Sequence, residues 1–266
     1  METVKNTALV TGANSGIGFA ICAELAKRGY PLLMISNENE KLKEAASNLS
    51  AEYGIKAIPF CIDLAKIDSA QEILIYCQVN NITVEILVNN AGIFFFKDVC
   101  DTTLEKSRLM LNLHINTPFT LTQIFAKQMI AEKRKGYILN MSSISSRMMV
   151  PYIALYSSTK SFLRCFSRAM RNEVFDKGVS ITTISPGAVA TNLYNLPARY
   201  MKLGIFLGII IKPARLASLA VKKMFKRKAE YIPGGFINNL FIFIVNILSE
   251  KSIRKIKRKI DSKIKS

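Results

Sequence analysis

Short apolar runs alternate with longer helical patterns along most of the chain, and this alternation limits the fold more than any other feature. Seven runs rich in Val, Ile and Leu are expected to form strands: Thr7–Thr11, Pro31–Ser36, Lys56–Ile62, Glu85–Asn89, Gly136–Ser143, Val179–Ser185 and Glu230–Ile232. Helical patterns lie between them at 16–28, 38–52, 68–79, 102–133, 153–177 and 213–227. The runs are continuously apolar, which is typical of a sheet buried on both faces. The pattern predicts an α/β fold with a single doubly wound parallel sheet and helices on both sides.

Length and composition fit one large domain, 1–235, followed by a C-terminal apolar and basic helical extension, 236–266. Half of the 266 residues are hydrophobic and 21% are charged, a balance that excludes intrinsic disorder. No apolar run reaches the ~20 residues of a membrane-spanning helix, and the first strand begins too early for a signal peptide. Five cysteines without a CxxC pair and a single histidine predict reduced thiols and no metal site. These features together predict a cytoplasmic protein.

The net charge of +18 is concentrated near the end of the chain. Residues 1–198 carry 20 basic and 16 acidic side chains, whereas residues 199–266 carry 17 and 3. Within the tail, Ile253, Ile256, Ile260 and Ile264 recur at helical spacing among basic residues. Such a helix favours peripheral contact with an anionic membrane surface, here the inner face of the membrane. A solvated tail without a partner stays an alternative, and the lack of aromatic side chains argues against nucleic-acid binding.

A glycine-rich turn connects the first strand to the first helix. The segment Thr11–Gly18 (TGANSGIG) places Gly12, Gly16 and Gly18 where a backbone must turn sharply and approach a ligand closely. The helix that follows directs unpaired N–H groups toward that ligand, which suits a pyrophosphate. We therefore expect a dinucleotide on this turn, bound also by Asn14, Ser15 and Ile17.

The end of the second strand bears on the choice of nucleotide. An acidic residue there binds the ribose 2′-hydroxyl and repels a 2′-phosphate, but this strand ends in Ser36 and Asn37. The missing acid favours NADP(H). An arginine that would pair with a 2′-phosphate is missing too, and only Lys41 is a substitute. NAD(H) therefore remains an alternative.

Tyr156 and Lys160 lie four residues apart in a predicted helix, so they share one face. A tyrosine ordinarily titrates near ~10, and a neighbouring ammonium favours the phenolate. This pair predicts a proton donor that works near neutral pH. Ser142, Ser143 and Ser145 lie at or just after the end of the fifth strand, at the sheet edge where ligands of such folds bind.

Four motifs together resemble the short-chain dehydrogenase/reductase family, which has a Rossmann-type fold. They are TGxxxGIG at 11–18, NNAG at 89–92, YxxxK at 156–160 and PG at 186–187. The resemblance covers about residues 5–190. It implies that Ser143 binds the substrate carbonyl, and that Asn116 is the fourth catalytic residue, which holds a water on a proton path from Lys160. His114 matches no role in the family and is interpreted as a packing residue.

The resemblance also implies cofactor contacts beyond the turn. Asp63 and Leu64 would bind the adenine, although Asp63 could instead cap a helix. Asn90, Ala91 and Gly92 would pass beneath the adenine-side ribose. The nicotinamide end would contact Tyr156, Lys160, Pro186, Gly187, Val189 and Thr191.

The function implied is an oxidoreductase that transfers hydride between NADP(H) and a ketone or secondary alcohol. An apolar segment, 190–212, would cover a lipid-like substrate such as a steroid or a long-chain 3-keto lipid, or would simply pack on the core. The chain is most similar to the branch of steroid dehydrogenases and 3-ketoacyl or 3-ketosphinganine reductases. By the same resemblance, the long helices at 102–133 and 153–177 are where family members pair, so a homodimer or homotetramer is expected. A non-catalytic protein with the same fold, which senses nucleotide or is tethered to a membrane, is the alternative.

Overall fold

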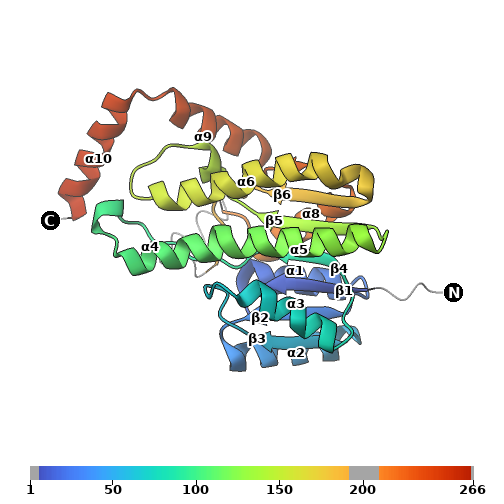
Figure 1. Ribbon diagram of the computed structural model, residues 1–266. Helices are drawn as coiled ribbons and strands as arrows, with labels where there is room; N and C mark the ends of the chain where they lie inside the picture. The colour runs from blue at the N-terminus through green and yellow to red at the C-terminus, as the bar shows by residue number, and fades with distance from the viewer. Residues whose placement is uncertain (1–5, 192–209, 265–266) are drawn as a thin grey trace.

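The computed structural model describes residues 6–191 and 210–264, and these residues form a seven-stranded parallel sheet (Figure 1). The strands are β1 (Thr7–Thr11), β2 (Leu32–Ser36), β3 (Ala57–Cys61), β4 (Val84–Asn89), β5 (Gly136–Met141), β6 (Val179–Ile184) and β7 (Glu230–Tyr231). Their spatial order is β3-β2-β1-β4-β5-β6-β7. The predicted doubly wound sheet is confirmed, with strand ends within two residues of those expected.

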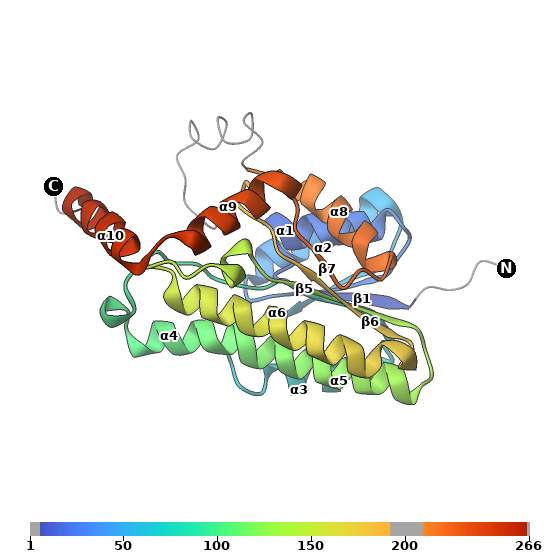
Figure 2. The same ribbon diagram turned by 90° about the horizontal axis from the view of Figure 1, so that it is seen from above.

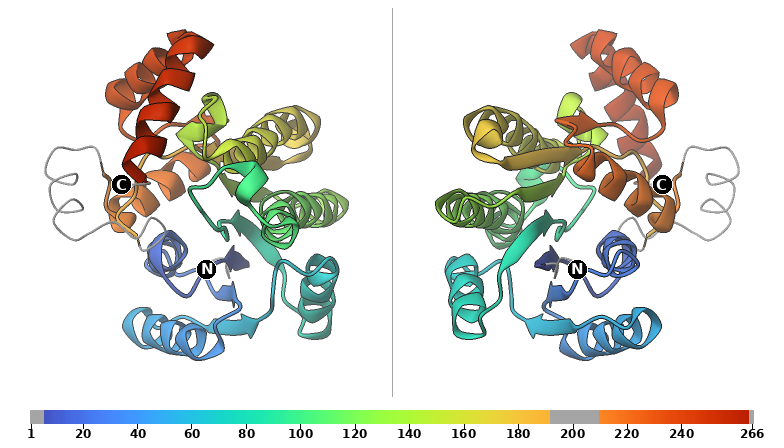
Figure 3. Two further views of the ribbon diagram at one scale, coloured as in Figure 1. Left: turned by 90° about the vertical axis from the view of Figure 1, so that its left-hand side faces the viewer. Right: turned by 90° about the vertical axis from the view of Figure 1, so that its right-hand side faces the viewer.

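Helices cover both faces of the sheet (Figure 2). One face carries α1 (Gly16–Ala26), α2 (Asn39–Tyr53) and α8 (Pro213–Phe225), and the other carries α3 (Ser69–Val79), α5 (Thr117–Ala131) and α6 (Ala154–Val174). Figure 3 shows the two helical layers on either side of the twisted sheet. Because both faces are covered, every residue of β2 is buried, and each such aliphatic side chain contributes about 1.5–3 kcal/mol to folding.

Both edges of the sheet are blunted. The edge strand β3 carries Pro59 opposite Met34 of β2, and a proline has no N–H to donate to a further strand. At the other edge β7 has only two residues. Short or proline-containing edges resist pairing with another chain.

The long helix expected at 102–133 is divided. It begins as α4 (Leu104–Leu111), passes through a π-helical turn at Asn112–Asn116, and continues as α5. A π-helical turn holds one residue more than an α-helical turn, so it rotates the face that the following residues present. The rotation determines which polar side chain of the turn faces the interior, and that residue is His114.

Two helices follow the sheet. α9 (Gly235–Ile247) and α10 (Glu250–Ile264) lie at the end of the molecule away from the N-terminus, as does α4 (Figure 1). α10 is attached by an ion pair of 2.7 Å between Lys257 and Asp98 and by a 2.5 Å hydrogen bond from the Tyr152 hydroxyl to Asp261. Within the described residues, no helix combines the length and apolarity required to cross a bilayer.

Candidate active site

The glycine turn after β1 is tightly packed, and its three glycines are each disfavoured for a side chain, either by backbone angle or by a clash. Gly12 and Gly16 have φ angles of +63° and +55°, a region that favours glycine. A Cβ on Gly18 would lie 1.9 Å from the carbonyl oxygen of Gly12. The first turn of α1 carries no acidic residue. The turn therefore presents backbone and a helix N-terminus to the space above it.

That space is a cleft of about 590 Å³ at the carboxyl ends of β1, β2 and β4. It is lined by thirteen of the residues expected to bind a nucleotide: Gly12, Asn14, Ser15, Gly16, Ile17, Ser36, Asn37, Asp63, Leu64, Asn90, Ala91, Gly92 and Thr191. Gly18 lies beneath the turn and acts by packing. Asp63 faces the cleft and also accepts a hydrogen bond of 2.9 Å from the backbone N–H of Ala65, so its two expected roles coexist.

Thr11 holds one wall of this cleft, although no role was expected for its side chain. Its hydroxyl oxygen accepts hydrogen bonds from the backbone N–H groups of Asn90 (2.9 Å) and Ala91 (3.0 Å), and it donates to the carbonyl of Val88. The Asn90 amide donates in return to the carbonyl of Thr11 at 3.0 Å. The loop after β4 is thereby fixed against the glycine turn.

Glu38 is a second residue that the sequence analysis missed. It lines the cleft two residues beyond the end of β2, where its carboxylate accepts a 3.0 Å hydrogen bond from Asn14 and forms an ion pair with Lys41. Hydrogen bonds from Lys41 and Asn14 lower the pKa of this carboxyl. An acid therefore lines the cleft just beyond the end of β2, with a cation beside it.

A smaller pocket of about 60 Å³ opens beside the cleft and holds most of the expected catalytic residues. Ser143, Tyr156 and Lys160 line it together with Pro186, Gly187, Val189 and Thr191. Ser143 caps the short 3-10 helix Ile144–Arg147, and its hydroxyl oxygen accepts from the N–H of Ser145 at 3.2 Å. The other candidate serines differ in environment: Ser142 donates to the carbonyl of Lys160, and Ser145 does not line this pocket.

Lys160 is buried beside the ring of Tyr156. Its ammonium donates a 3.0 Å hydrogen bond to the carbonyl of Met141 and lies 5.8 Å from the Tyr156 ring centroid. Burial lowers the pKa of Lys160 to about 8. The ammonium form still predominates at neutral pH, so a buried cation is held next to a phenol.

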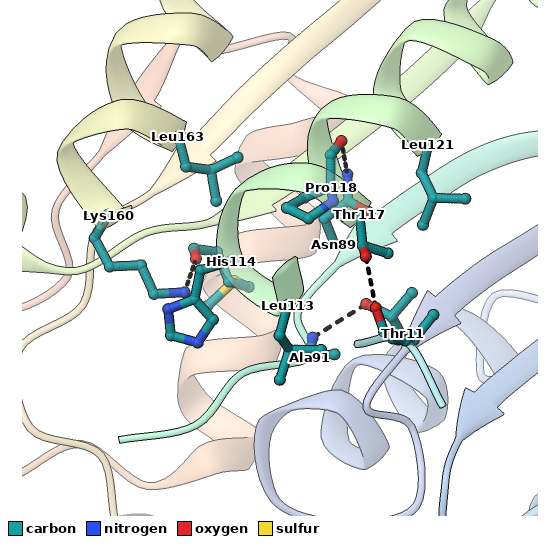
Figure 4. Close-up of a pocket in the computed structure, with 12 residues that line it drawn as sticks. Thr11, Asn89, Ala91, Leu113, His114, Thr117, Pro118, Leu121, Lys160 and Leu163 are labelled. Carbon is teal, nitrogen blue, oxygen red and sulfur yellow. Dashed lines mark hydrogen bonds between the residues drawn. The ribbon is translucent and has the colours of Figure 1, made fainter. Parts of the chain in front are cut away.

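The structure does not bring Asn116 together with the other three expected catalytic residues. Its side chain is exposed, donates to Asn112 at 2.7 Å and lines neither the cleft nor the small pocket. The π-helical turn brings His114 inward instead, where it is 1% exposed and lines the pocket with Tyr156 and Lys160. His114 and Lys160 also line a minute cavity beneath the pocket (Figure 4).

The extension forms part of the surroundings of this pocket. A Cβ on Gly187 would lie 3.0 Å from the side chain of Asn238 in α9, so glycine permits that close packing. Asn246 of α9 donates a 2.9 Å hydrogen bond to the carbonyl of Arg147, at the end of the turn that Ser143 caps. The segment 192–209, most of the apolar stretch expected to cover the substrate, lies outside the described residues.

Comparisons with known proteins agree with this arrangement. The family model for short chain dehydrogenase matches residues 6–197. The very-long-chain 3-oxoacyl-CoA reductase-A of Danio rerio is 36% identical over 196 residues, which cover 70% of this chain and 59% of that protein. The chain thus matches about three fifths of the length of this curated relative.

Solved structures share the fold over nearly their whole length. A short-chain dehydrogenase from Sphingobium yanoikuyae in complex with NADPH has a TM-score of 0.78 at 21% identity, with coverage of 92% of this chain and 97% of that one. An alcohol dehydrogenase from Thermococcus sibiricus complexed with 5-hydroxy-NADP has a TM-score of 0.74 at 26% identity, with coverage of 86% and 95%. With the glycine turn, the cleft and the Ser143–Tyr156–Lys160 pocket, these matches identify the chain as a member of the short-chain dehydrogenase family.

Proposed function

We propose that the chain is an NADP(H)-dependent oxidoreductase that reduces the ketone of a lipid-like substrate, or oxidises the matching alcohol. The observation that carries this proposal is the pocket in which Ser143, Tyr156 and buried Lys160 meet beside the glycine-turn cleft. The name of the Danio rerio relative supports a long-chain 3-oxoacyl thioester as substrate. Steroid ketones are the next class to test.

The residues of the cleft fit a nicotinamide dinucleotide. Gly12 and Gly18 let the turn pack closely on itself and on the loop after β4, and the N-terminus of α1 is available to an anionic pyrophosphate. NADP(H) is favoured because β2 itself ends without an acid and Lys41 neutralises Glu38. The ligands named for the Sphingobium and Thermococcus proteins point the same way. NAD(H) is the alternative, because Glu38 can bind a 2′-hydroxyl.

When bound, the reduced nicotinamide supplies a hydride to the carbonyl carbon of the substrate. Ser143 donates a hydrogen bond to the carbonyl oxygen and fixes its position. Tyr156 gives its phenolic proton to the oxygen as negative charge develops there. Lys160 stabilises the resulting phenolate, and this stabilisation is strengthened because both side chains are buried, where charges interact more strongly than in water. In the oxidation direction the same groups remove the proton.

The Tyr156→Phe variant tests the chemistry. It removes the transferable proton but keeps the ring against Phe94 and His114, so turnover should fall by about 10²–10⁴-fold with nucleotide affinity nearly unchanged. Activity is measured by nicotinamide absorbance with long-chain 3-oxoacyl-CoA, 3-ketosphinganine and steroid ketones, each with NADPH and NADH. Equal turnover in the variant would contradict the mechanism. Nucleotide binding without turnover of any ketone would favour the non-catalytic sensor.

A second function, peripheral membrane contact, is supported by α9. Its apolar side chains remain exposed, among them Phe241 (50%), Phe243 (62%) and Ile247 (63%). Exposed basic residues follow in α10: Lys251, Arg254, Lys255, Arg258 and Lys259. Adjacent apolar and cationic surfaces suit the interface of an anionic membrane, at its inner face for a cytoplasmic protein.

Vesicle flotation tests this contact. Binding to phosphatidylserine-containing vesicles should be lost in the Phe241→Ser/Phe243→Ser variant and weakened by removal of residues 249–266. Vesicles of phosphatidylcholine alone are the control. Unchanged flotation in both variants would exclude the extension as the membrane contact.

Self-association is proposed through α5 and α6. Phe119 and Phe162 remain partly exposed there and contact Phe166, so an aromatic surface is available to a second copy. A homodimer or homotetramer is expected, and sedimentation of a Phe162→Ser variant tests it.

A further inference from the structure

His114 is buried and lines the small pocket beside Ile93, which lines both that pocket and the cleft, and its hydrogen bonds have a defined direction. The backbone N–H of Ile93 donates to Nε2 at 2.9 Å. Because Nε2 accepts this hydrogen bond, it carries no proton, and the neutral ring must carry its proton on Nδ1. Nδ1 lies 3.0 Å from the hydroxyl oxygen of Thr159 and donates to it.

Thr159 continues the chain of hydrogen bonds. Its hydroxyl donates to the backbone carbonyl of Tyr156 at 2.8 Å. The hydrogen bonds therefore run in one direction. The loop after β4 donates to the imidazole, the imidazole donates to Thr159, and Thr159 donates to the first turn of α6. The imidazole also packs edge-on against the Tyr156 ring, with 5.7 Å between centroids.

Electrostatics keep this ring neutral. Burial, assisted by the cation of Lys160, lowers the pKa of His114 well below its usual range. A second proton on the ring would point an N–H at the N–H of Ile93 and place a second charge beside Lys160. The loop approaches so closely that a Cβ on Gly92 would lie 2.9 Å from Nε2. No rotated or doubly protonated ring fits these contacts.

We propose that His114 is a positioning residue, a neutral imidazole in one tautomer that ties the nucleotide-binding loop at Ile93 to the backbone of Tyr156. In this role it neither gives nor takes a proton during turnover. It fixes the distance between the bound nucleotide and the phenol, so its loss should lower kcat more than it weakens binding. The proposal rests on the proposed oxidoreductase function.

Two substitutions distinguish positioning from packing. His114→Asn keeps one acceptor for Ile93 and one donor for Thr159, whereas His114→Phe fills the space without either. Positioning predicts that His114→Phe loses roughly 10-fold to 100-fold in kcat while His114→Asn stays within about 3-fold of the parent, and that the Kd for NADPH changes little in both. Packing predicts the reverse order, because asparagine leaves a cavity and phenylalanine does not. The reverse order, or equal kcat in the two variants, would overturn the proposal.

The ring itself provides a readout that does not depend on turnover. His114 is the only histidine of the chain, so its ¹⁵N and ¹H signals need no assignment by mutation. We expect the Nδ1–H tautomer with no titration between pH 5 and pH 8. An Nε2–H tautomer, or titration near the ordinary histidine value, would overturn the proposal even if the enzyme were active. If the parent protein reduced no ketone, the oxidoreductase function would fail while these spectra still tested the link.

Discussion

The nucleotide cleft and the C-terminal extension of α9 and α10 differ in how their residues are held. Around the cleft, the backbone is one partner in the main contacts: the Gly18 backbone packs on the Gly12 carbonyl, and the Thr11 hydroxyl accepts from the backbone N–H groups of Asn90 and Ala91. The extension is attached through side chains, such as Lys257 on Asp98. We therefore expect the cleft to tolerate few substitutions. The attachment of the extension should tolerate substitution but weaken at high salt, because it depends on an ion pair.

Gly18→Ala should have the largest effect, because it attacks the backbone packing of the cleft. The new methyl would lie 1.9 Å from the Gly12 oxygen, so we expect a loss of about 3 kcal/mol in the free energy of unfolding. NADPH affinity should fall roughly 100-fold, since a misplaced turn loses its alignment with the nucleotide. Gly54→Ala is the control for backbone strain without a clash, because its φ of +64° disfavours alanine but nothing lies within 4 Å of the new Cβ. Normal NADPH binding by Gly18→Ala would contradict the claim that the cleft depends on this close backbone packing.

Lys160→Met should abolish turnover and yet stabilise the nucleotide-free protein. Burial lowers the folded-state pKa of Lys160 to about 8 from 10.5, so below pH 8 the folded state carries the cost of a buried charge. Methionine removes this cost, and we expect a gain of about 1–3 kcal/mol at pH 7.

The sign of the pH dependence follows from the same shift. Between pH 8 and pH 10.5 the unfolded chain binds the lysine proton more strongly than the folded one, so the parent gains stability as pH rises. The advantage of Lys160→Met should therefore shrink over that window in urea unfolding. A constant advantage from pH 7 to pH 10 would show that the ammonium is not the cause.

Glu38→Gln should change the choice of nucleotide by a smaller amount. Removing the carboxylate leaves Lys41 free to meet a 2′-phosphate, so the preference for NADPH over NADH should rise about 2-fold to 5-fold. Glu40→Gln is the control, since Glu40 pairs with Lys43 and does not line the cleft. A higher relative affinity for NADH in Glu38→Gln would contradict this placement.

The smallest effect is expected where α10 is attached. Asp98→Asn with Asp261→Asn removes both carboxylates that contact Lys257 and Tyr152. Hydrogen exchange should become faster in α10 alone, with NADPH affinity within about 2-fold of the parent. Glu250→Gln, which removes only an exposed pair with Arg254, is the control. High salt should imitate the double variant, because exposed ion pairs are screened. A large loss of NADPH affinity would show that the two regions are coupled.

Sequence alone predicted the sheet because its signal is local. Each strand is a continuous apolar run, and the turn at Gly12–Gly18 has a spacing that few other structures require. Tyr156 and Lys160 were placed correctly because α6 is regular through both residues. The strand boundaries moved by at most two residues.

Asn116 was expected in the active site, but His114 lies there instead, and the difference has a physical cause. An α-helical period assigns faces by counting ~100° per residue, and the π-helical turn at Asn112–Asn116 breaks that count. Nothing in the local sequence marks the turn, since its stability depends on contacts with Ile93 and Thr159 that are distant in the chain. Glu38 was missed for a related reason, because the backbone after β2 bends back over the cleft.

The blunted rims of the sheet limit how this protein can join other molecules. Strand-by-strand growth needs a row of free N–H and C=O groups, and Pro59 in β3 and the two-residue β7 interrupt that row on either side. Conversion to cross-β fibres from the native state is disfavoured for the same reason. A second copy would therefore bind more readily through side chains on the helices than by extending the sheet, so such a contact could be altered one side chain at a time without disturbing the hydrogen-bond ladder within.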